Sequence, residues 1–577
     1  MERCELAALH RWSTPAMTDG EASADCEPLC IVKSANARLD DPVHRTSTRT
    51  AGNLAMAAGA GVAVVVSAVM LARLIEPVRF TFDEWMFIAV RNRFSVDNVL
   101  RSHNGHPSML PALVYMLGFH TVGLHDQWFY RSALILTHLA LCGSLAVLVW
   151  RRHGAIVAAA VWLLVCFMGA GATNIVWPFQ IGLVGSALFF VLAVGALDRL
   201  RESGRTRDAI RCACMVTASV MCSAVGLAAL VAIGVVIIVG KNRRRHWWVP
   251  VVPLAGWASW WRFYGESSNT TTDFGAILDV IRQSAEMTGA AILSGNDTVG
   301  GLLVVTLFVT ATLAVARRRI EFHQTVGLVF VATFWILTSS TRAVMLQTLG
   351  FPPPARYLYI AVVGLLLAIS DLAPPCRSAR RTIVVGALCM VIAITSVWAG
   401  HADLIRERDL FEAFGQKTAA ELTVIDAHPE AFADDMALVE LLGQPLITIG
   451  EYRAASEHLD SKGGLTSAEL TDLPSGRAGA AESIMLPLLN VESGQPDACR
   501  TTRATALTLT LEPGSTIAFV TSGATTMVAA RWLPPDPGPG SARDLEEGAW
   551  TIMAPYDHLR PAWSIAFDRP VLVLDCA

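Results

Sequence analysis

The sequence LAMAAGAGVAVVVSAVMLARLI occupies residues 54–75, and Phe82-Asp83-Glu84-Trp85 follows it closely. A segment of this length and apolarity can cross a lipid bilayer, which requires roughly 20 apolar residues. Two adjacent carboxylates just beyond such a segment are costly to keep near lipid, so they indicate a functional site by default. This stretch therefore predicts a membrane protein whose chemistry lies near Asp83 and Glu84.

The composition of the whole chain agrees with this class. Its 577 residues are 53% hydrophobic and 16% charged, whereas a soluble domain has roughly 25% charged residues. The mean hydropathy is +0.46. A formal net charge of −4 gives no reason to expect nucleic acid as a partner.

Apolar segments recur from residue 54 to residue 400 and then stop. We expect about eleven membrane spans, of which two neighbours in the middle of the chain are shorter than a full crossing. The expected spans are 54–75, 129–150, 154–172, 176–197, 210–223, 225–240, 247–264, 298–316, 322–341, 356–373 and 382–400. Short helices at membrane depth usually line a cavity rather than face lipid.

The basic loops between these spans all fall on one side of the membrane. They contain Arg45 and Arg49, Arg151-Arg152, Arg199 to Arg211, Lys241 to Arg245, Arg317 to Arg319, and Arg377 to Arg381. Lys and Arg mark the cytoplasmic side of membrane proteins. We therefore expect a cytoplasmic N-terminus, a first outer loop at 76–128 with an interfacial helix at 107–124, and a C-terminus outside.

Composition also divides the chain into parts. Residues 1–53 are polar and predict a disordered cytoplasmic tail before the transmembrane domain at 54–400. Residues 401–577 predict an extracytoplasmic α+β domain that is helical at 401–442. Short alternating runs within 500–577, separated by Pro and Gly, predict a small β-sandwich. Cys499 and Cys576 flank these strands, and an oxidising exterior permits either a disulfide or two free thiols.

This layout resembles the GT-C class of membrane glycosyltransferases, including its protein-mannosyltransferase-like members. The resemblance covers roughly residues 54–400 and rests on Asp83-Glu84 in the first outer loop, His106-Pro107-Ser108-Met109-Leu110 at the interfacial helix, Arg131 in the next span, the split pair at 210–240, and Arg356-Tyr357 at a late span. It implies an inverting enzyme of the bacterial plasma membrane. Such an enzyme transfers sugar from a polyprenyl-phosphate carrier to a glycan, lipid or protein acceptor on the outer face. Ser108 departs from the family's second proline.

The outer residues suit that chemistry. Attack by a hydroxyl group on an anomeric carbon needs a base, and Asp83 or Glu84 can act as one. These carboxylates could also hold Mg²⁺ or Mn²⁺. The leaving lipid phosphate needs cations, which arginines at an outer loop would supply. The residues that we expect to contact substrate are His103, His106, Arg131, Trp177, Gln180, Arg342, Arg356 and Tyr357.

Structural roles are open for several of these residues as well. Asp83 and Glu84 can oppose the dipole of a short helix, and Arg356 can anchor the end of a span. Trp177 can belong to an aromatic belt. Two other functions also stay open: a transporter of lipid-linked glycan, and a non-catalytic scaffold whose outer domain binds a partner.

Overall fold

The structure is a computed structural model of the chain. It describes residues 42–240, 243–266, 270–293, 295, 297–316, 322–350, 352–370, 379–441, 444–494, 499–533 and 542–576. The chain separates into two compact units, Met1–Ala63 and Val64–Ala577. Helix α1 (Pro42–Ile75) begins in the first unit. The expected tail at 1–53 is therefore helical from Pro42 onward, and its first 41 residues lie outside the described part.

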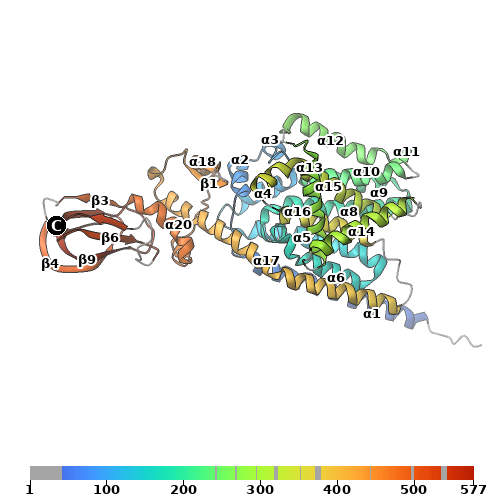
Figure 1. Cartoon of the computed structure of the whole chain (residues 1–577), viewed down its shortest axis with the longest axis horizontal. Helices are drawn as coiled ribbons and strands as arrows, with labels where there is room; N and C mark the ends of the chain where they lie inside the picture. Colours follow the sequence, from blue (N-terminus) through green and yellow to red (C-terminus); the bar gives the residue numbers. More distant parts are fainter. Residues whose placement is uncertain are drawn as a thin grey trace, which may run out of the picture. The chain divides into compact units, whose positions relative to one another are not determined.

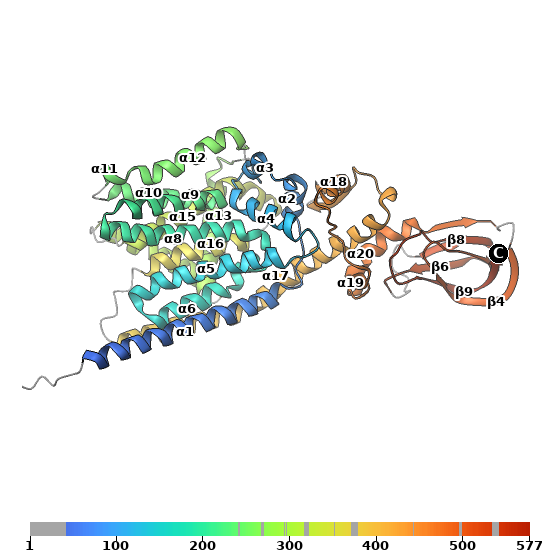
Figure 2. The same ribbon diagram turned by 180° about the vertical axis from the view of Figure 1, so that it is seen from behind.

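Helices make up most of the second unit (Figure 1 and Figure 2). They range in length from single turns to the 49 residues of α17. They are α2 (Asp83–Arg91), α3 (Val96–Leu100), α4 (Met109–Thr121), α5 (Trp128–His153), α6 (Ala155–Cys166), η1 (Gly169–Gly171), α7 (Ala172–Val176), η2 (Pro178–Gln180), α8 (Ile181–Ser203), α9 (Thr206–Cys222), α10 (Val225–Val239), α11 (Arg243–His246), α12 (Trp248–Tyr264), α13 (Phe274–Ile292), α14 (Asp297–Ala316), α15 (Phe322–Leu349), α16 (Ala355–Ser370) and α17 (Ala379–Ala427).

Among the described residues, five helices are long and apolar enough to cross a membrane, or up to seven if each of two bent pairs counts as one span. Every expected span overlaps at least one helix, and α4 forms where the interfacial helix was expected. The expected span at 154–172 is broken, because α6 and the following helix meet at an angle of 50°. Helix α13 lies between the expected spans 247–264 and 298–316, where no helix was expected. The number of crossings and their sidedness remain predictions.

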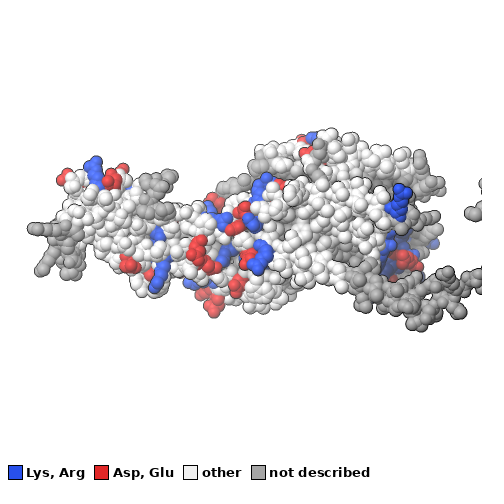
Figure 3. Space-filling view, turned by 90° about the horizontal axis from the view of Figure 1, so that it is seen from below, with Lys and Arg blue, Asp and Glu red and all other residues white. Residues whose placement is uncertain are grey.

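The surface also has a broad region with few charges. On the face in Figure 3, few charged side chains lie between two groups of Lys, Arg, Asp and Glu. Many exposed side chains on the helices are apolar, among them Val65, Ile238, Leu302 and Trp398. Exposed apolar side chains in this number suit a lipid-facing surface.

Helix α17 continues to Ala427, so it includes the first part of the helix expected at 401–442. Pro429 ends this helical region, because proline lacks a backbone N–H and restrains the residue before it. Strand β1 begins at Ala437, inside the range expected to be helical. The chain continues through η3 (Pro429–Ala431), β1 (Ala437–Leu441), β2 (Gln444–Thr448), α18 (Ile449–Leu459), α19 (Ser467–Thr471), α20 (Ser475–Met485) and η4 (Leu486–Leu488).

The C-terminal strands form one continuous antiparallel sheet, in the order β3-β8-β5-β9-β6-β7 with β4 beside β9. They are β3 (Asn490–Ser493), β4 (Cys499–Leu511), β5 (Thr516–Thr521), β6 (Thr525–Ala530), β7 (Ala542–Leu545), β8 (Gly548–Met553) and β9 (Trp563–Cys576). The first half of β9 pairs with β6 and its second half with β5. Pro570 lies between these halves, and one strand shared by two parts of a sheet is typical of sandwich corners. The strand-rich domain is therefore present.

The two cysteines of this domain are partners in the strand register. Cys499 of β4 lies opposite Cys576 of β9. Their side chains lie outside the described part of the chain, so the disulfide remains a prediction.

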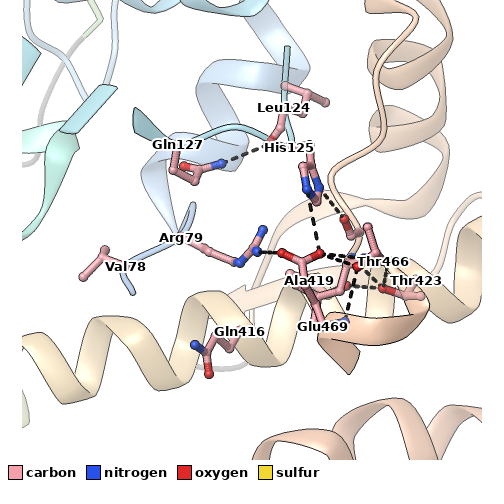
Figure 4. Close-up of polar contacts among 12 residues, drawn as sticks. Val78, Arg79, Leu124, His125, Gln127, Gln416, Ala419, Thr423, Thr466 and Glu469 are labelled. Atoms are coloured by element: carbon pink, nitrogen blue, oxygen red, sulfur yellow. Dashed lines mark hydrogen bonds and ion pairs between the residues drawn. The ribbon is translucent and has the colours of Figure 1, made fainter. Parts of the chain in front are cut away.

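Polar contacts join the first outer loop to the segment after α17 (Figure 4). Arg79 donates a hydrogen bond of 2.7 Å to Glu469 Oε1, and His125 Nε2 lies 3.8 Å from Glu469 Oε2. Ser461 Oγ accepts a hydrogen bond of 2.8 Å from the Leu124 backbone N–H. Helix α18 also packs against α2. The segment that follows α17 therefore supports the loop that contains Asp83.

Candidate active site

A cavity of about 240 Å³ opens beside the first turn of α2. Seven of the residues predicted to contact substrate or act in catalysis line it: Asp83, His103, His106, Gln180, Arg342, Arg356 and Tyr357. Residues from α2, η2, α12, α15 and α16 and from the break between α9 and α10 contribute to its walls. The structure therefore brings together residues that are more than 250 positions apart in the sequence.

The cavity is lined by the helix ends that lie away from the basic loops. Helix α8 contributes its start at Gly182 and Leu183, and α15 contributes the region around Arg342 near its end. Helix α16 contributes its start at Arg356. The basic loops follow α8 and precede α15. The cavity therefore lies at the end of these helices opposite the basic loops.

A tight turn holds the two histidines side by side. The backbone N–H of each donates to the carbonyl of the other, His103 to His106 at 3.0 Å and His106 to His103 at 2.9 Å. Asn104 and Gly105 between them have φ values of 51° and 75°. Positive φ at both central positions is the requirement of a type I′ turn, which favours Asn-Gly. This sequence signal was readable, and it fixes where both imidazoles enter the cavity.

Both histidines are neutral at physiological pH. Burial lowers the pKa of His103 to about 3, with Arg91 and His106 adding to the effect. Burial also lowers the pKa of His106 to about 4, with help from Arg342 and Arg356. A neutral imidazole offers one hydrogen-bond donor and one acceptor. These rings can therefore bind sugar hydroxyl groups, and they do not add positive charge to the cavity.

Asp83 presents its carboxylate to the cavity. Its side chain is 20% exposed, and its Oδ1 lies 4.0 Å from His103 Nε2. Burial raises the pKa of this carboxyl, while the charge of Arg356, a hydrogen bond from Asn104 and the charge of Arg342 partly offset the rise. A carboxylate with a raised pKa is a better general base than an ordinary one.

Glu84 points in the other direction, into the protein core. It is 1% exposed and accepts three hydrogen bonds: 2.6 Å from the Tyr115 hydroxyl, 2.9 Å from the Thr81 N–H and 3.0 Å from the Trp177 indole. Burial raises its pKa to about 7, although these three bonds oppose the rise. Glu84 does not line the cavity. It joins α2 to α4 and to the segment before η2.

The backbone before these two acids is strained. Phe82 has a φ of 36° and a ψ of −109°, which is unusual for a residue with a side chain. Its ring packs against Phe414 at 4.8 Å and against Phe411 and Trp177 at 6.4 Å between centroids. Strained backbone persists where the surrounding packing enforces it, and it clusters at functional sites. The conformation of Phe82 sets the direction in which Asp83 leaves the backbone.

Arg342 and Arg356 provide the positive charge of the cavity. Both are partly buried, and both lie close enough to Asp83 for their charges to lower its pKa. The Arg356 guanidinium carbon lies 5.4 Å from the centre of the Tyr357 ring. In the described part of the chain, neither guanidinium forms an ion pair. Two unpaired cations beside one carboxylate leave room for an anionic ligand.

The other predicted residues divide between cavity and support. Gln180 is 2% exposed and lines the cavity, and its Oε1 has no hydrogen-bond partner in the described ranges. Trp177 does not line the cavity, and its indole N–H donates to Glu84. Arg131 donates two hydrogen bonds, of 3.0 and 2.7 Å, to the Val78 carbonyl and does not line the cavity. Arg131 and Trp177 therefore position the first outer loop.

Much of the cavity lining is apolar. It includes Leu183 and Leu227, and the aromatic rings of Trp257, Trp261 and Phe334. Sequence reasoning did not single out these aromatic residues, because an aromatic belt is expected at any span end. A lining that combines these apolar side chains with two arginines that have no ion pair among the described residues suits a ligand with an anionic head and a hydrocarbon chain.

A metal ion shared by Asp83 and Glu84 does not fit this arrangement. The Glu84 oxygens already accept three hydrogen bonds and face the core, so the two carboxylates do not converge. Among the described residues, the only group of three metal-ligating side chains is His138, Cys142 and Cys166. Both ring nitrogens of His138 already have partners, the Tyr359 hydroxyl at 2.8 Å and the Cys166 carbonyl at 3.1 Å.

Two solved structures align with this chain. They are crystal structures of ArnT from Cupriavidus metallidurans. The structure bound to undecaprenyl phosphate has 13% sequence identity and a TM-score of 0.41, and the apo structure has 12% identity and a TM-score of 0.44. Each alignment covers 70% of this chain and 85% of the ArnT chain. No family model and no curated protein matches the chain.

Proposed function

We propose that the protein is a membrane glycosyltransferase that takes a sugar from a polyprenyl-phosphate carrier at the end of the bundle opposite the basic loops. One observation carries this proposal: Arg342 and Arg356, without ion pairs among the described residues, line one cavity with Asp83. Guanidinium groups bind phosphate oxygens through paired hydrogen bonds. The apolar part of the lining suits the first prenyl units of the carrier.

The reaction follows from the positions of these charges. Asp83 accepts the proton of the acceptor hydroxyl while that oxygen forms a bond to the anomeric carbon. The bond from the anomeric carbon to the phosphate oxygen breaks, and the lipid phosphate leaves with the electron pair. Arg342 and Arg356 stabilise the negative charge that develops on it. One cavity-facing carboxylate acting as base suits direct displacement with inversion.

Neutral polar groups complete the binding of the sugar. His103 and His106 each keep one ring nitrogen for a sugar hydroxyl, since His103 Nε2 lies 3.2 Å from Asn104 Nδ2 and His106 hydrogen-bonds the Gly105 backbone. Among the described residues the Gln180 Oε1 has no partner, so it can accept from a sugar hydroxyl. A site built to hydrogen-bond a hydroxyl rejects analogues that lack it, because its buried groups would then stay unpaired. We assign sugar recognition to these three residues.

The basic loops support an orientation with the cavity and the C-terminal domain outside the cytoplasm. We place the protein in the bacterial plasma membrane, as the GT-C resemblance implies. The contacts of Glu469 and Ser461 with the first outer loop support a role for the C-terminal segment in holding the acceptor near Asp83. The acceptor can be a glycan, a lipid or a protein. Undecaprenyl phosphate, which the ArnT structure contains, is the carrier to test first.

The first experiment measures the binding of undecaprenyl phosphate to the purified full chain. Wild type is compared with the double variant Arg342→Gln/Arg356→Gln and with Arg101→Gln, which removes an exposed arginine of the first outer loop that does not line the cavity. We expect the double variant to bind at least about 100-fold more weakly, because it loses two charge-assisted contacts. Arg101→Gln should bind like wild type. Equal binding by all three proteins would refute the proposal.

The second experiment separates an enzyme from a transporter or a scaffold. Cells that make wild type or Asp83→Asn are compared for glycosylated products, and both proteins are tested for carrier binding. If the protein is an enzyme, cells that make Asp83→Asn lack the glycosylated product, while the Asp83→Asn protein still binds undecaprenyl phosphate. Unchanged product in Asp83→Asn would remove the assignment of the base.

A further inference from the structure

A second cavity, of about 530 Å³, lies at the opposite end of the helices, beside the basic loops. The ends of α8 and α10, the start of α15 and the short helix α11 line it. Most of the lining is apolar, and Leu197, Val236 and Val239 are among its residues. Val239 is 81% exposed, so an apolar lip continues from the cavity to the outer surface of the helices.

His246 is the unusual residue of this cavity. It is 5% exposed, and neither Nδ1 nor Nε2 has a hydrogen-bond partner among the residues that the structure describes. Leaving a buried polar atom unsatisfied costs about 1–3 kcal/mol, so native proteins rarely leave both nitrogens of a ring without partners. Burial and the neighbouring Arg245 lower the pKa of His246. The ring is therefore neutral and offers one N–H donor and one acceptor nitrogen.

Arg201 supplies an unused cation at the same cavity. Its guanidinium carbon lies 4.3 Å from the centre of the Phe322 ring, and in the described part of the chain it forms no ion pair. Two of the acids closest in sequence are engaged elsewhere: Asp198 lies 2.7 Å from His323 Nε2, and Asp208 accepts a hydrogen bond from Ser203 at 2.7 Å. The third, Glu202, is exposed to solvent. An anion that reaches this cavity would therefore meet a guanidinium group that has no ion pair among the described residues.

From these contacts we infer that the second cavity binds the headgroup of an anionic phospholipid with a hydroxyl-bearing headgroup. The phosphate accepts from Arg201 and from the N–H of His246, and a headgroup hydroxyl donates to the other ring nitrogen. The acyl chains leave along Leu197 and Val239. Basic pockets between transmembrane helices on the cytoplasmic side are suited to such headgroups. This site is separate from the proposed transferase site and does not depend on it.

Native mass spectrometry of the full chain tests this inference. The protein is reconstituted in phosphatidylglycerol or in phosphatidylcholine, extracted into detergent, and examined for retained lipid. Wild type is compared with Arg201→Gln, His246→Leu and His246→Gln. The control is Arg205→Gln, which removes an exposed arginine of the same basic loop outside the cavity.

We expect wild type to retain one phosphatidylglycerol and no phosphatidylcholine. Arg201→Gln and His246→Leu should each reduce retention about tenfold, the effect of one lost charge-assisted or buried hydrogen bond. His246→Gln keeps a donor and an acceptor and should restore most of it. Arg205→Gln should behave as wild type.

Three outcomes would overturn the inference. In the first, Arg201→Gln and Arg205→Gln retain equal phosphatidylglycerol, so the cavity is not where the lipid binds. In the second, inorganic phosphate added to protein in phosphatidylcholine raises the unfolding temperature as much as phosphatidylglycerol does. The ligand would then be a free anion. In the third, His246→Leu changes thermal stability equally in both lipids without changing retention, so His246 is satisfied by water alone.

Discussion

The two sides of the first turn of α2 differ in how their polar groups are satisfied. On the core side, Glu84 accepts three hydrogen bonds and is 1% exposed. On the cavity side, Asp83 is 20% exposed and faces two guanidinium groups that have no ion pair among the described residues. The two carboxylates are adjacent in sequence and yet lie in opposite environments.

This difference shows how a chain can use one acidic pair for two purposes. A satisfied buried group costs little and fixes neighbouring elements, whereas an unsatisfied group at a cavity stays ready for a ligand. Glu84 ties α2 to Tyr115 and Trp177, and it thereby holds Asp83 toward Arg342 and Arg356. Variants that affect one side and leave the other intact should therefore separate catalysis from stability.

The largest effect should come from Asp83→Asn. Asparagine keeps the size and hydrogen bonding of the side chain but cannot take a proton, so the transfer rate should fall by about 10²–10⁴-fold, the usual contribution of a general base. The thermal unfolding temperature should change little. The control is Glu84→Gln, which should lose less than about tenfold. A larger loss in Glu84→Gln than in Asp83→Asn would reverse the roles of the two sides.

The next effect should come from the cavity cations taken singly. Arg356→Gln should lower kcat by about 10²–10³-fold, as the removal of one donor to a developing anion does. Arg356→Lys should recover part of this rate, because an ammonium group keeps the charge but not the paired geometry. The measurement is the transfer rate at saturating carrier. A change in KM alone would mean that Arg356 binds the carrier without stabilising the leaving phosphate.

On the core side, Glu84→Ala should act on stability. It leaves the Tyr115, Thr81 and Trp177 donors without a partner, and each unsatisfied group costs about 1–3 kcal/mol. Glu84→Gln can accept from Thr81 and Trp177 and donate to the Tyr115 hydroxyl, so it should cost less than about 1.5 kcal/mol. Denaturant unfolding in detergent measures both. Equal stability of the Ala and Gln variants would show that these bonds do not support the fold.

Much of this contrast could be anticipated from sequence, but not which acid faces which side. The apolar segments predict the helices, and the arginines at their ends predict the charge of the cavity. The orientations of Asp83 and Glu84 depend on the strained φ of Phe82 and on Trp177, which come from tertiary packing. Asn104-Gly105 was a readable turn signal, and the Thr-x-x-Glu capping boxes at Thr448 and Thr466 were readable helix starts.

The smallest effect should be a pH dependence of stability on the core side. Burial raises the pKa of Glu84 to about 7 from its ordinary 4.5, so the folded state holds this proton more tightly than the unfolded chain. The stabilisation is therefore complete below pH 4.5 and is lost as the pH rises to about 7, at no more than about 1.4 kcal/mol per pH unit. Subtracting the unfolding profile of Glu84→Gln from that of wild type isolates this contribution, since Asp83 titrates in both proteins. A difference profile that is flat between pH 4.5 and 7 would mean that the three donors keep Glu84 ionised throughout, and the core side would then be a charged anchor.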